Sequence, residues 1–275
     1  MIKRCLLDTI KEQIGCGKAL ILLGARQVGK TTLLKELVKD RDDVYWLNGD
    51  ELDVQEMFEH ISADRLKSIF GNNKIVIIDE AQRIKDIGLR LKLITDQIKE
   101  IQLIATGSSS FELANNVNEP LTGRKWEYKM FPISFEEMVE ENGLLTEKRL
   151  LPQRLIYGYY PDIVTNAGNE KNILKQLTDS YLYKDILAWE DIKKSDKLLK
   201  LLQALAFQVG NQVSYNELGK LCSLDSKTVE KYILLLEQCF VIFRLNSFSR
   251  NLRNELKSSK KIYFYDNGIR NALIA

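Results

Sequence analysis

The sequence contains very little of what builds metal centres and disulfide frameworks. It has one histidine, His60, and four cysteines among its 275 residues. Cys5, Cys16, Cys222 and Cys239 are scattered, without a C-x-x-C pair or another spacing typical of metal ligands. A single histidine with no second ligand near it in the sequence does not make a zinc site. We therefore expect reduced, mostly buried thiols in a cytoplasmic protein, and His60 on its surface.

Long apolar runs and an excess of charge are absent as well. No apolar run approaches the ~18 residues that span a bilayer, and Asp8, Lys11 and Glu12 interrupt the stretch where a signal peptide would be apolar. The formal net charge is +2, so any nucleic-acid contact needs a local basic patch rather than an overall field. The sequence predicts a globular protein, long enough for two domains, with no membrane partner.

The most informative stretch that is present follows the pattern G-x-x-x-x-G-K-[ST], which is typical of a phosphate-binding loop. A strand-like apolar run at 19–23 precedes it and a helix-like run follows it, as the motif requires. The N–H groups of such a loop and the start of the helix bind phosphate oxygens. Lys30 is expected to reach the β- and γ-phosphates of ATP, and the Thr31 hydroxyl to ligate Mg²⁺. The residues expected to bind the nucleotide here are Gly24, Arg26, Gln27, Val28, Gly29, Lys30, Thr31 and Thr32.

A second motif lies downstream of this loop. The apolar run 75–78 ends in two carboxylates, Asp79 and Glu80, which is the pattern of a Walker B strand. Asp79 is expected to hold Mg²⁺ and Glu80 to act as general base on the attacking water. The phosphate loop upstream favours this interpretation over a buried strand that simply ends in an acidic turn.

Two further positions leave alternatives open. Thr106 and Ser108 follow the next strand and could sense the γ-phosphate or position water, or they could belong to a turn in which Ser110 caps a helix over 111–116. Arg124 precedes the last strand of the first half. It could act as an arginine finger, in cis or from a neighbouring copy in a homo-oligomer, or it could be a surface arginine in an ion pair.

Apolar strands and helical patterns alternate through the first half of the chain. The expected strands are 19–23, 44–47, 75–78, 103–105 and 126–128, and the expected helices lie near 30–40, 51–70, 87–99 and 111–116. Near-continuous apolar strands separated by helices indicate a parallel sheet that is covered on both faces. The fold class expected is α/β, with a parallel-sheet P-loop NTPase domain of AAA type over 1–140 and a mostly helical region after it.

The second half reads as a helical connector over 141–195 and a winged helix-turn-helix over 196–247. Its helices are expected over 198–206, over 215–221 with Ser214 as cap, and from a cap at Ser226, followed by a first wing strand over 240–245. Three helices followed by a ribbon is the order of a winged helix.

Basic residues lie on the third of these helices and after it. They could contact double-stranded DNA through phosphates, with Lys227, Lys231, Arg244, Arg250 and Arg253 as the candidates. Winged helices also serve as protein–protein modules, and a run of charge is often only a solvated face, so both alternatives stay open.

Several motifs together resemble those of one family. They are 24–32, 78–82, 106–109, 121–124 and 130–137 in the first half, and Gly158-Tyr159-Tyr160-Pro161, 181–186 and 261–268 in the second. This set is similar to that of prokaryotic AAA-like ATPases that join a P-loop domain to a winged helix and then to a part similar to PD-(D/E)xK nucleases. The resemblance implies ATP binding, hydrolysis and a cytosolic location.

The chain departs from that family at its C-terminal end. Family members usually run on past the position of Gly268 into the nuclease-like fold, whereas this chain stops at Ala275. The resemblance implies that 248–275 is the start of a truncated nuclease-like domain without nuclease activity. We therefore expect an exposed, poorly packed edge over 262–275.

Three functions are compatible with these observations. The first is a Mg²⁺-dependent ATPase that couples its nucleotide state to the winged helix. The second is a non-hydrolysing switch that holds ATP or ADP and whose winged helix binds DNA or a protein. The third is an ATP site that has lost its output together with the nuclease-like part. Asp79 and Glu80 together favour the first, since a pure sensor does not need a general base.

Overall fold

The computed structural model describes residues 2–59, 61–108, 121–187, 195–246 and 260–275. The chain divides into two compact units, Met1–Phe131 and Pro132–Ala275. Some sequence expectations fall outside the described residues. They are the surface position of His60, the helix over 111–116 with its cap Ser110, and the DNA contacts of Arg250 and Arg253.

Unit 1 is built around a five-stranded parallel sheet with the strand order β2-β3-β4-β1-β5. The strands are β1 (Ala19–Gly24), β2 (Val44–Asn48), β3 (Ile75–Asp79), β4 (Gln102–Gly107) and β5 (Lys125–Met130). All five strands expected from the apolar runs are present. The expectation of an α/β fold with a parallel sheet is confirmed.

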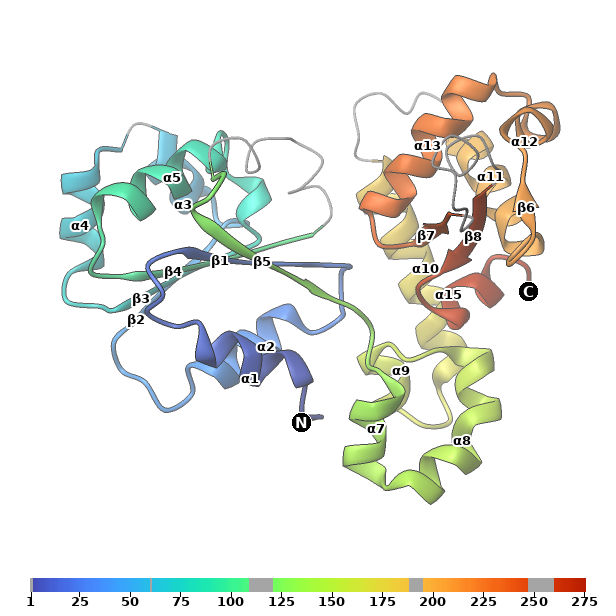
Figure 1. The fold of residues 1–275 in the computed structure, drawn as a ribbon, viewed down its shortest axis with the longest axis horizontal. Helices are drawn as coiled ribbons and strands as arrows, with labels where there is room; N and C mark the ends of the chain where they lie inside the picture. The colour runs from blue at the N-terminus through green and yellow to red at the C-terminus, as the bar shows by residue number, and fades with distance from the viewer. Residues whose placement is uncertain (1, 60, 109–120, 188–194, 247–259) are drawn as a thin grey trace, which may run out of the picture. The chain divides into compact units, whose positions relative to one another are not determined.

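Helices cover both faces of this sheet, as Figure 1 shows. On one face lie α1 (Cys5–Glu12) and α2 (Lys30–Leu37), and on the other α3 (Leu52–Glu59), α4 (Ala63–Phe70) and α5 (Ile87–Gln97). Every residue of β1, β3 and β4 is buried, which is why these strands read as continuous apolar runs. The single helix expected over 51–70 is two helices, because Ser62 caps a new start by accepting from the Arg65 N–H at 3.3 Å.

The parallel direction places the ends of β1, β3 and β4 at one edge of the sheet. At this carboxyl edge Leu23 is level with Gly107, and Gly24 with Met130 of β5. Ligands of open α/β sheets bind in the crevice outside these strand ends. The loop after β1 and the polar residues that end β3 and β4 therefore meet where a ligand is expected.

The first part of unit 2 is a group of helices. It contains α7 (Phe135–Asn142), α8 (Leu144–Tyr157), α9 (Pro161–Thr165) and α10 (Glu170–Leu187), and α15 (Asn267–Ala272) packs against α8. The fully buried carboxylate of Glu147 accepts hydrogen bonds from Arg154, Tyr159 and Asn142, each at 3.1 Å. These partners satisfy a charge that would be costly to bury alone.

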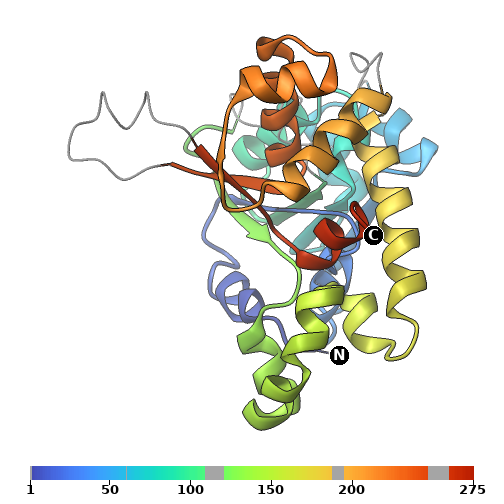
Figure 2. The ribbon, with the colours of Figure 1, turned by 90° about the vertical axis from the view of Figure 1, so that its right-hand side faces the viewer.

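The rest of unit 2 combines three helices with a small antiparallel sheet. Its elements are α11 (Ser195–Phe207), β6 (Gln212–Val213), α12 (Tyr215–Cys222), α13 (Ser226–Gln238), β7 (Ile242–Leu245) and β8 (Lys260–Phe264). The strand order is β6-β8-β7, and Figure 2 shows β7 and β8 running side by side. Ser214 caps α12 as expected. The cap of α13 is Asp225 rather than Ser226, because the Asp225 carboxylate accepts the Thr228 N–H at 2.8 Å.

The expectation of an exposed, poorly packed edge over 262–275 is wrong. β8 is the central strand of its sheet and pairs with a strand on each side, and Ile262 and Ile269 are buried. The turn after β8 is anchored as well, because the Asp266 carboxylate accepts the Tyr159 N–H at 2.8 Å. A Cβ on Gly268 would collide with the Tyr157 carbonyl, so only glycine permits this approach.

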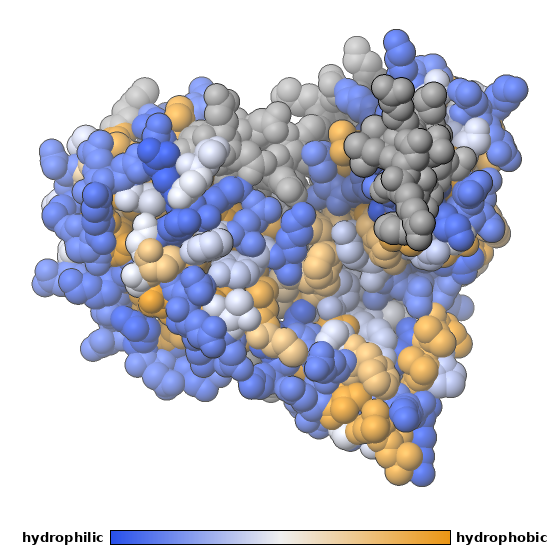
Figure 3. Space-filling view, in the orientation of Figure 1, coloured by the Kyte–Doolittle hydropathy of each residue, from blue (hydrophilic) through white to orange (hydrophobic). Residues whose placement is uncertain are grey.

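Apolar side chains gather on the surface over α7 and α8, as Figure 3 shows. The exposed members on α8 are Leu144, Leu145, Leu151, Leu155 and Ile156. Within the described part of the chain, no helix combines the length and the apolar character needed to cross a bilayer.

Candidate nucleotide-binding site

The loop between β1 and α2 has the backbone geometry of a phosphate cradle. It contains two residues with positive φ, Gln27 at 61° and Gly29 at 97°. Glycine adopts such angles without strain, whereas glutamine there is held by its surroundings. A Cβ on Gly24 would collide with the Met130 carbonyl, so glycine at this position lets β5 close against the loop.

Lys30 is held inside this loop. Its side chain is 6% exposed, and its ammonium donates to the carbonyls of Gly24 at 2.8 Å and Ala25 at 2.9 Å. The positive charge of Lys30 therefore lies within the phosphate loop. To contact a phosphate, Lys30 has to exchange these carbonyl acceptors for phosphate oxygens.

Thr31 and Asp79 meet across the carboxyl edge of the sheet. The Thr31 hydroxyl donates to Asp79 Oδ2 at 2.7 Å, although the two residues lie 48 positions apart in the sequence. The other carboxylate oxygen, Oδ1, accepts from the Thr106 hydroxyl. The set of a hydroxyl and a carboxylate oxygen fits Mg²⁺, which binds one or two protein oxygens together with substrate phosphates. The structure therefore brings together both residues expected to hold the metal.

Thr106 has a different contact from the one expected. Its buried hydroxyl accepts the Glu80 N–H at 3.1 Å and donates to Asp79, so it holds the turn after β3. A hydroxyl engaged in this way orients the Walker B carboxylate, and its contact with a γ-phosphate or a water stays a prediction. Ser108, the other candidate, is buried just after β4.

Glu80 lies in that turn with a strained backbone, at φ 50° and ψ 39°. Its carboxylate accepts a hydrogen bond from Gln82 Nε2 at 2.5 Å. The Gln82 carbonyl oxygen is buried, and no described residue donates to it. Sequence reasoning did not single out Gln82, whose only signal was its place in the motif 78–82.

Arg124 is not brought to the phosphate loop of its own chain. It precedes β5 at the amino edge of the sheet, where its backbone carbonyl bonds to the N–H of Ala19. The loop follows the opposite end of β1, about 17 Å away along a strand that rises ~3.3 Å per residue. The Arg124 guanidinium pairs with Asp96 at 2.6 Å, which is the surface ion pair named above as the alternative. Contact with the nucleotide of a neighbouring copy stays a prediction.

The remaining loop residues follow the motif. Val28 is buried, Arg26 is half-buried, and Gln27 and Thr32 are exposed. Sequence reasoning missed a residue that touches the loop from outside the motif. Arg4, which precedes α1, donates to the Val28 carbonyl at 2.8 Å.

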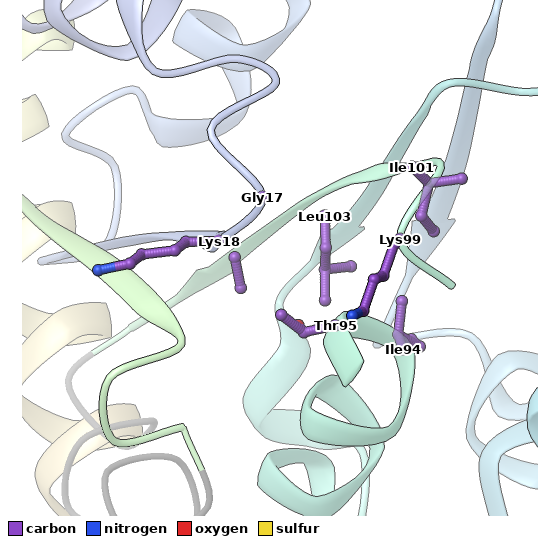
Figure 4. Close-up of a pocket in the computed structure, with 8 residues that line it drawn as sticks. Gly17, Lys18, Ile94, Thr95, Lys99, Ile101 and Leu103 are labelled. Carbon is purple, nitrogen blue, oxygen red and sulfur yellow. The ribbon is translucent and has the colours of Figure 1, made fainter. Parts of the chain in front are cut away.

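A cavity of about 210 Å³ lies elsewhere in unit 1 (Figure 4). Its lining includes Lys18 and Ala19 at the start of β1, Leu103 of β4, and Ile94 and Lys99. In Figure 4 the Lys18 side chain points away from the other lining residues. The cavity belongs to the amino edge of the sheet, so it is separate from the phosphate loop.

Comparison with protein families divides the chain in two. Residues 17–139 match a family described as an AAA domain. Residues 148–275 match a family described as a domain of unknown function, DUF8612. The AAA match covers the phosphate loop and all five strands of the parallel sheet.

Relatives from distant organisms share most of the chain. A protein from Haemophilus influenzae is 24% identical over 277 residues, covering 91% of this chain and 68% of the relative. A protein from Methanocaldococcus jannaschii is 22% identical over 275 residues, covering 90% of this chain and 60% of the relative. Both are called uncharacterized proteins, and this chain spans about two thirds of their length.

A solved structure has the same fold. The Walker-type ATPase of Pyrococcus abyssi aligns with a TM-score of 0.63 at 17% identity, covering 100% of this chain and 96% of that one. The likeness shows the fold of this chain, and together with the AAA match it supports a P-loop ATPase family.

Proposed function

We propose that this chain is a Mg²⁺-dependent ATPase that couples its nucleotide state to a winged helix able to contact double-stranded DNA. The ATPase half of this proposal rests on one observation, the hydrogen bond from the Thr31 hydroxyl to Asp79 Oδ2. It joins the phosphate loop to the end of β3 at the edge where α/β sheets bind ligands.

The nucleotide half of the proposal rests on three groups at this edge. The loop N–H groups and the start of α2 would receive the phosphates, and Lys30 would move from the Gly24 and Ala25 carbonyls to phosphate oxygens. Thr31 and Asp79 would hold Mg²⁺, with Thr106 keeping the Asp79 carboxylate oriented. When bound, Mg²⁺ supplies neutralisation of the charge on the β- and γ-phosphates.

Glu80 is the proposed general base for the attacking water. It directly follows Asp79, and its backbone is fixed by the bond from its N–H to Thr106. Its carboxylate accepts a hydrogen bond from Gln82 Nε2. Gln82 therefore either positions this carboxylate for the attacking water or keeps it from that water.

The test is steady-state ATP turnover with Mg²⁺ by the wild type and by Glu80→Gln. Loss of a general base typically lowers turnover by ~10²- to 10⁴-fold, whereas ATP affinity should change little. Glu56→Gln, the same change at an exposed position on α3, serves as the matched control. Turnover by Glu80→Gln at the wild-type rate would show that the base is another group.

One observation favours a second candidate, a nucleotide-dependent switch that hydrolyses ATP slowly or not at all. The bond from Gln82 occupies an oxygen of the proposed base. In this case the wild type binds ATP tightly with little or no turnover, and Gln82→Ala raises turnover because it frees that oxygen. Turnover that is the same in the wild type and Gln82→Ala would show that the bond does not restrain the base.

The winged-helix half of the proposal is supported by the order of elements in unit 2. The strand β6 lies between α11 and α12, and α13 is followed by β7 and β8. The three strands form one antiparallel sheet. A helix-turn-helix places its last helix in the major groove. The helix that would do so here is α13, which packs against α12.

Lys227 and Lys231 are the proposed DNA contacts, because both are exposed one turn apart on α13. Arg244 is a weaker candidate than the sequence suggested. Its guanidinium pairs with Glu237 and lies near the Tyr215 hydroxyl at 3.4 Å. These partners raise the pKa of Arg244 although burial opposes it, and the cation is neutralised within unit 2.

DNA contact is tested by the fluorescence anisotropy of a labelled duplex titrated at several salt concentrations. Replacing two phosphate contacts, as in Lys227→Glu/Lys231→Glu, should reduce the slope of log K against log salt by about 1.8. Lys200→Glu, an exposed lysine on α11, is the control. An unchanged slope would favour a protein partner for this module over DNA.

A further inference from the structure

We propose that Arg4 couples the phosphate loop to the strand through which unit 1 continues into unit 2. The proposal rests on the function proposed above, since it assigns an effect to nucleotide binding. It concerns a residue outside both sequence motifs, and it makes Arg4 a positioning residue rather than a catalytic one.

The Arg4 guanidinium joins two backbone segments that are far apart in the sequence. Its Nη1 donates to the Val28 carbonyl in the phosphate loop at 2.8 Å, and its Nη2 donates to the Phe131 carbonyl at 2.6 Å. The residue is only 9% exposed. Because the guanidinium is planar and rigid, one group fixes the positions of both carbonyls relative to each other.

Phe131 is the last residue of unit 1. On the other side of the boundary, the Ile133 N–H donates to the Tyr159 carbonyl of unit 2 at 2.9 Å. Pro132 alone separates these two anchored residues. The connection along the chain from Phe131 to the first anchored residue of unit 2 is therefore very short.

The loop also packs directly on the end of β5. Gly24 is level with Met130 in the parallel ladder, and Met130 is buried. A Cβ placed on Gly29 would lie 3.7 Å from Met130 Cε, in ordinary contact. The loop therefore approaches the end of β5 directly and is also joined to the next residue, Phe131, through Arg4.

The bond to Val28 links Arg4 to the phosphate through one peptide unit. The Val28 carbonyl and the Gly29 N–H belong to the same trans peptide and point in opposite directions. With the carbonyl held by Arg4, the Gly29 N–H faces away from it, as a loop that donates to phosphate requires. A phosphate accepting from that N–H polarises the peptide and strengthens the bond to Arg4.

The experiment compares ATP affinity and amide hydrogen exchange in the wild type, Arg4→Met and Arg4→Lys. In the wild type, saturating MgATP should slow exchange in two segments, 24–31 and 126–134. In Arg4→Met we expect ATP affinity to fall roughly tenfold, as for the loss of a charged hydrogen bond. At saturating MgATP this variant should keep the slowed exchange over 24–31 and lose it over 126–134.

Two further variants complete the design. Arg4→Lys keeps the charge but cannot hold two carbonyls with a planar fork, so it should also lose the effect over 126–134. If Arg4→Met does not fold, the exchange over 126–134 in Arg4→Lys tests the coupling instead. The control is Lys3→Met, which removes a neighbouring charge that pairs with Asp8 on the surface at 2.9 Å and should behave as the wild type.

The possible failures are distinguishable. If the wild type does not bind ATP, the proposed function fails and the coupling fails with it. If the wild type binds ATP but exchange over 126–134 does not change, the nucleotide site stands and the coupling is wrong. The same conclusion follows if MgATP slows exchange over 126–134 equally in the wild type and both Arg4 variants.

Discussion

Replacing Lys30 by alanine tests whether the loop after β1 binds a triphosphate. The Lys30 ammonium is the cation that the motif G-x-x-x-x-G-K-[ST] requires, and it is held by the Gly24 and Ala25 carbonyls at 2.8 and 2.9 Å. The exposed Lys35 at the end of α2 offers the same change of charge on the same helix. Comparing the two variants separates a local contact from a general loss of positive charge.

The expected loss of ATP affinity follows from the phosphate contact that Lys30 would gain and the two carbonyl contacts that it would give up. At about 4 Å and an effective dielectric constant of about 20, an ammonium and one phosphate charge attract by about 4 kcal/mol. Lys30 gives up its two carbonyl bonds to reach the phosphates, at a cost of about 1 kcal/mol each. The net loss in Lys30→Ala is therefore about 2 to 4 kcal/mol, or a ~30- to ~1,000-fold higher Kd for ATP.

The assay is isothermal titration of MgATP into the wild type, Lys30→Ala and Lys35→Ala, after thermal unfolding has shown that all three fold. We expect Lys35→Ala to bind ATP as the wild type does. An ATP affinity in Lys30→Ala within a factor of about 3 of the wild type, far below the change worked out above, would refute the assignment of this loop to the phosphates.

The remaining predictions concern the buried polar cluster of unit 2. Glu147→Ala should lower the free energy of unfolding by about 3–5 kcal/mol, because it leaves the Arg154 guanidinium buried without its carboxylate. Urea unfolding measures this, and an equal loss in the double variant with Arg154→Met would argue against the ion pair as the cause. Burial, and then the bond to Glu147, raise the pKa of Tyr159 to about 12, above the ~10 of an unfolded chain. The protonated Tyr159 therefore contributes free energy of unfolding that is fully present below about pH 10 and is lost as pH rises to about 12. Over this interval the free energy of unfolding should fall faster in the wild type than in Tyr159→Phe. Curves of unfolding free energy against pH that run parallel for the wild type and Tyr159→Phe over this interval would contradict the prediction.

The strands and the phosphate loop could be predicted because their signals are local. The apolar run Ile75–Ile78, followed by Asp79, has few arrangements other than a buried strand with a polar tip, and β3 has that form. The glycines at 24 and 29 mark a tight loop whatever the rest of the fold. The pairing of Thr31 with Asp79 followed from two such motifs, since both lie after parallel strands.

The position of Arg124 could also have been predicted from the same rule. A residue just before a strand of a parallel sheet lies at the edge opposite to a residue just after one. Arg124 precedes β5 whereas the loop follows β1, so a contact with the nucleotide of its own chain was excluded by strand direction. The structure agrees, with Arg124 beside Asp96.

Other features could not be predicted, because they depend on contacts far apart in the sequence. Phe131 is 127 residues away from Arg4, and no motif connects them. β6 has only two residues, too few to show a period. The central place of β8 in the small sheet depends on its pairing with β6 and β7, which no local pattern shows.

The coupling proposed for Arg4 follows from strand order as much as from one arginine. Across the sheet, the neighbouring strands β3, β4, β1 and β5 end in turn at Asp79, Gly107, Gly24 and Met130. The phosphate loop therefore lies between the strands that carry the polar tips and the strand that leaves unit 1. The last residue of β1, Gly24, pairs with the last residue of β5, Met130, so the loop begins beside the end of the strand that leaves unit 1. If the loop and Phe131 move together, nucleotide state reaches unit 2 from there without a rearrangement of the sheet, and in the proposed coupling the Arg4 guanidinium is the group that joins the two movements.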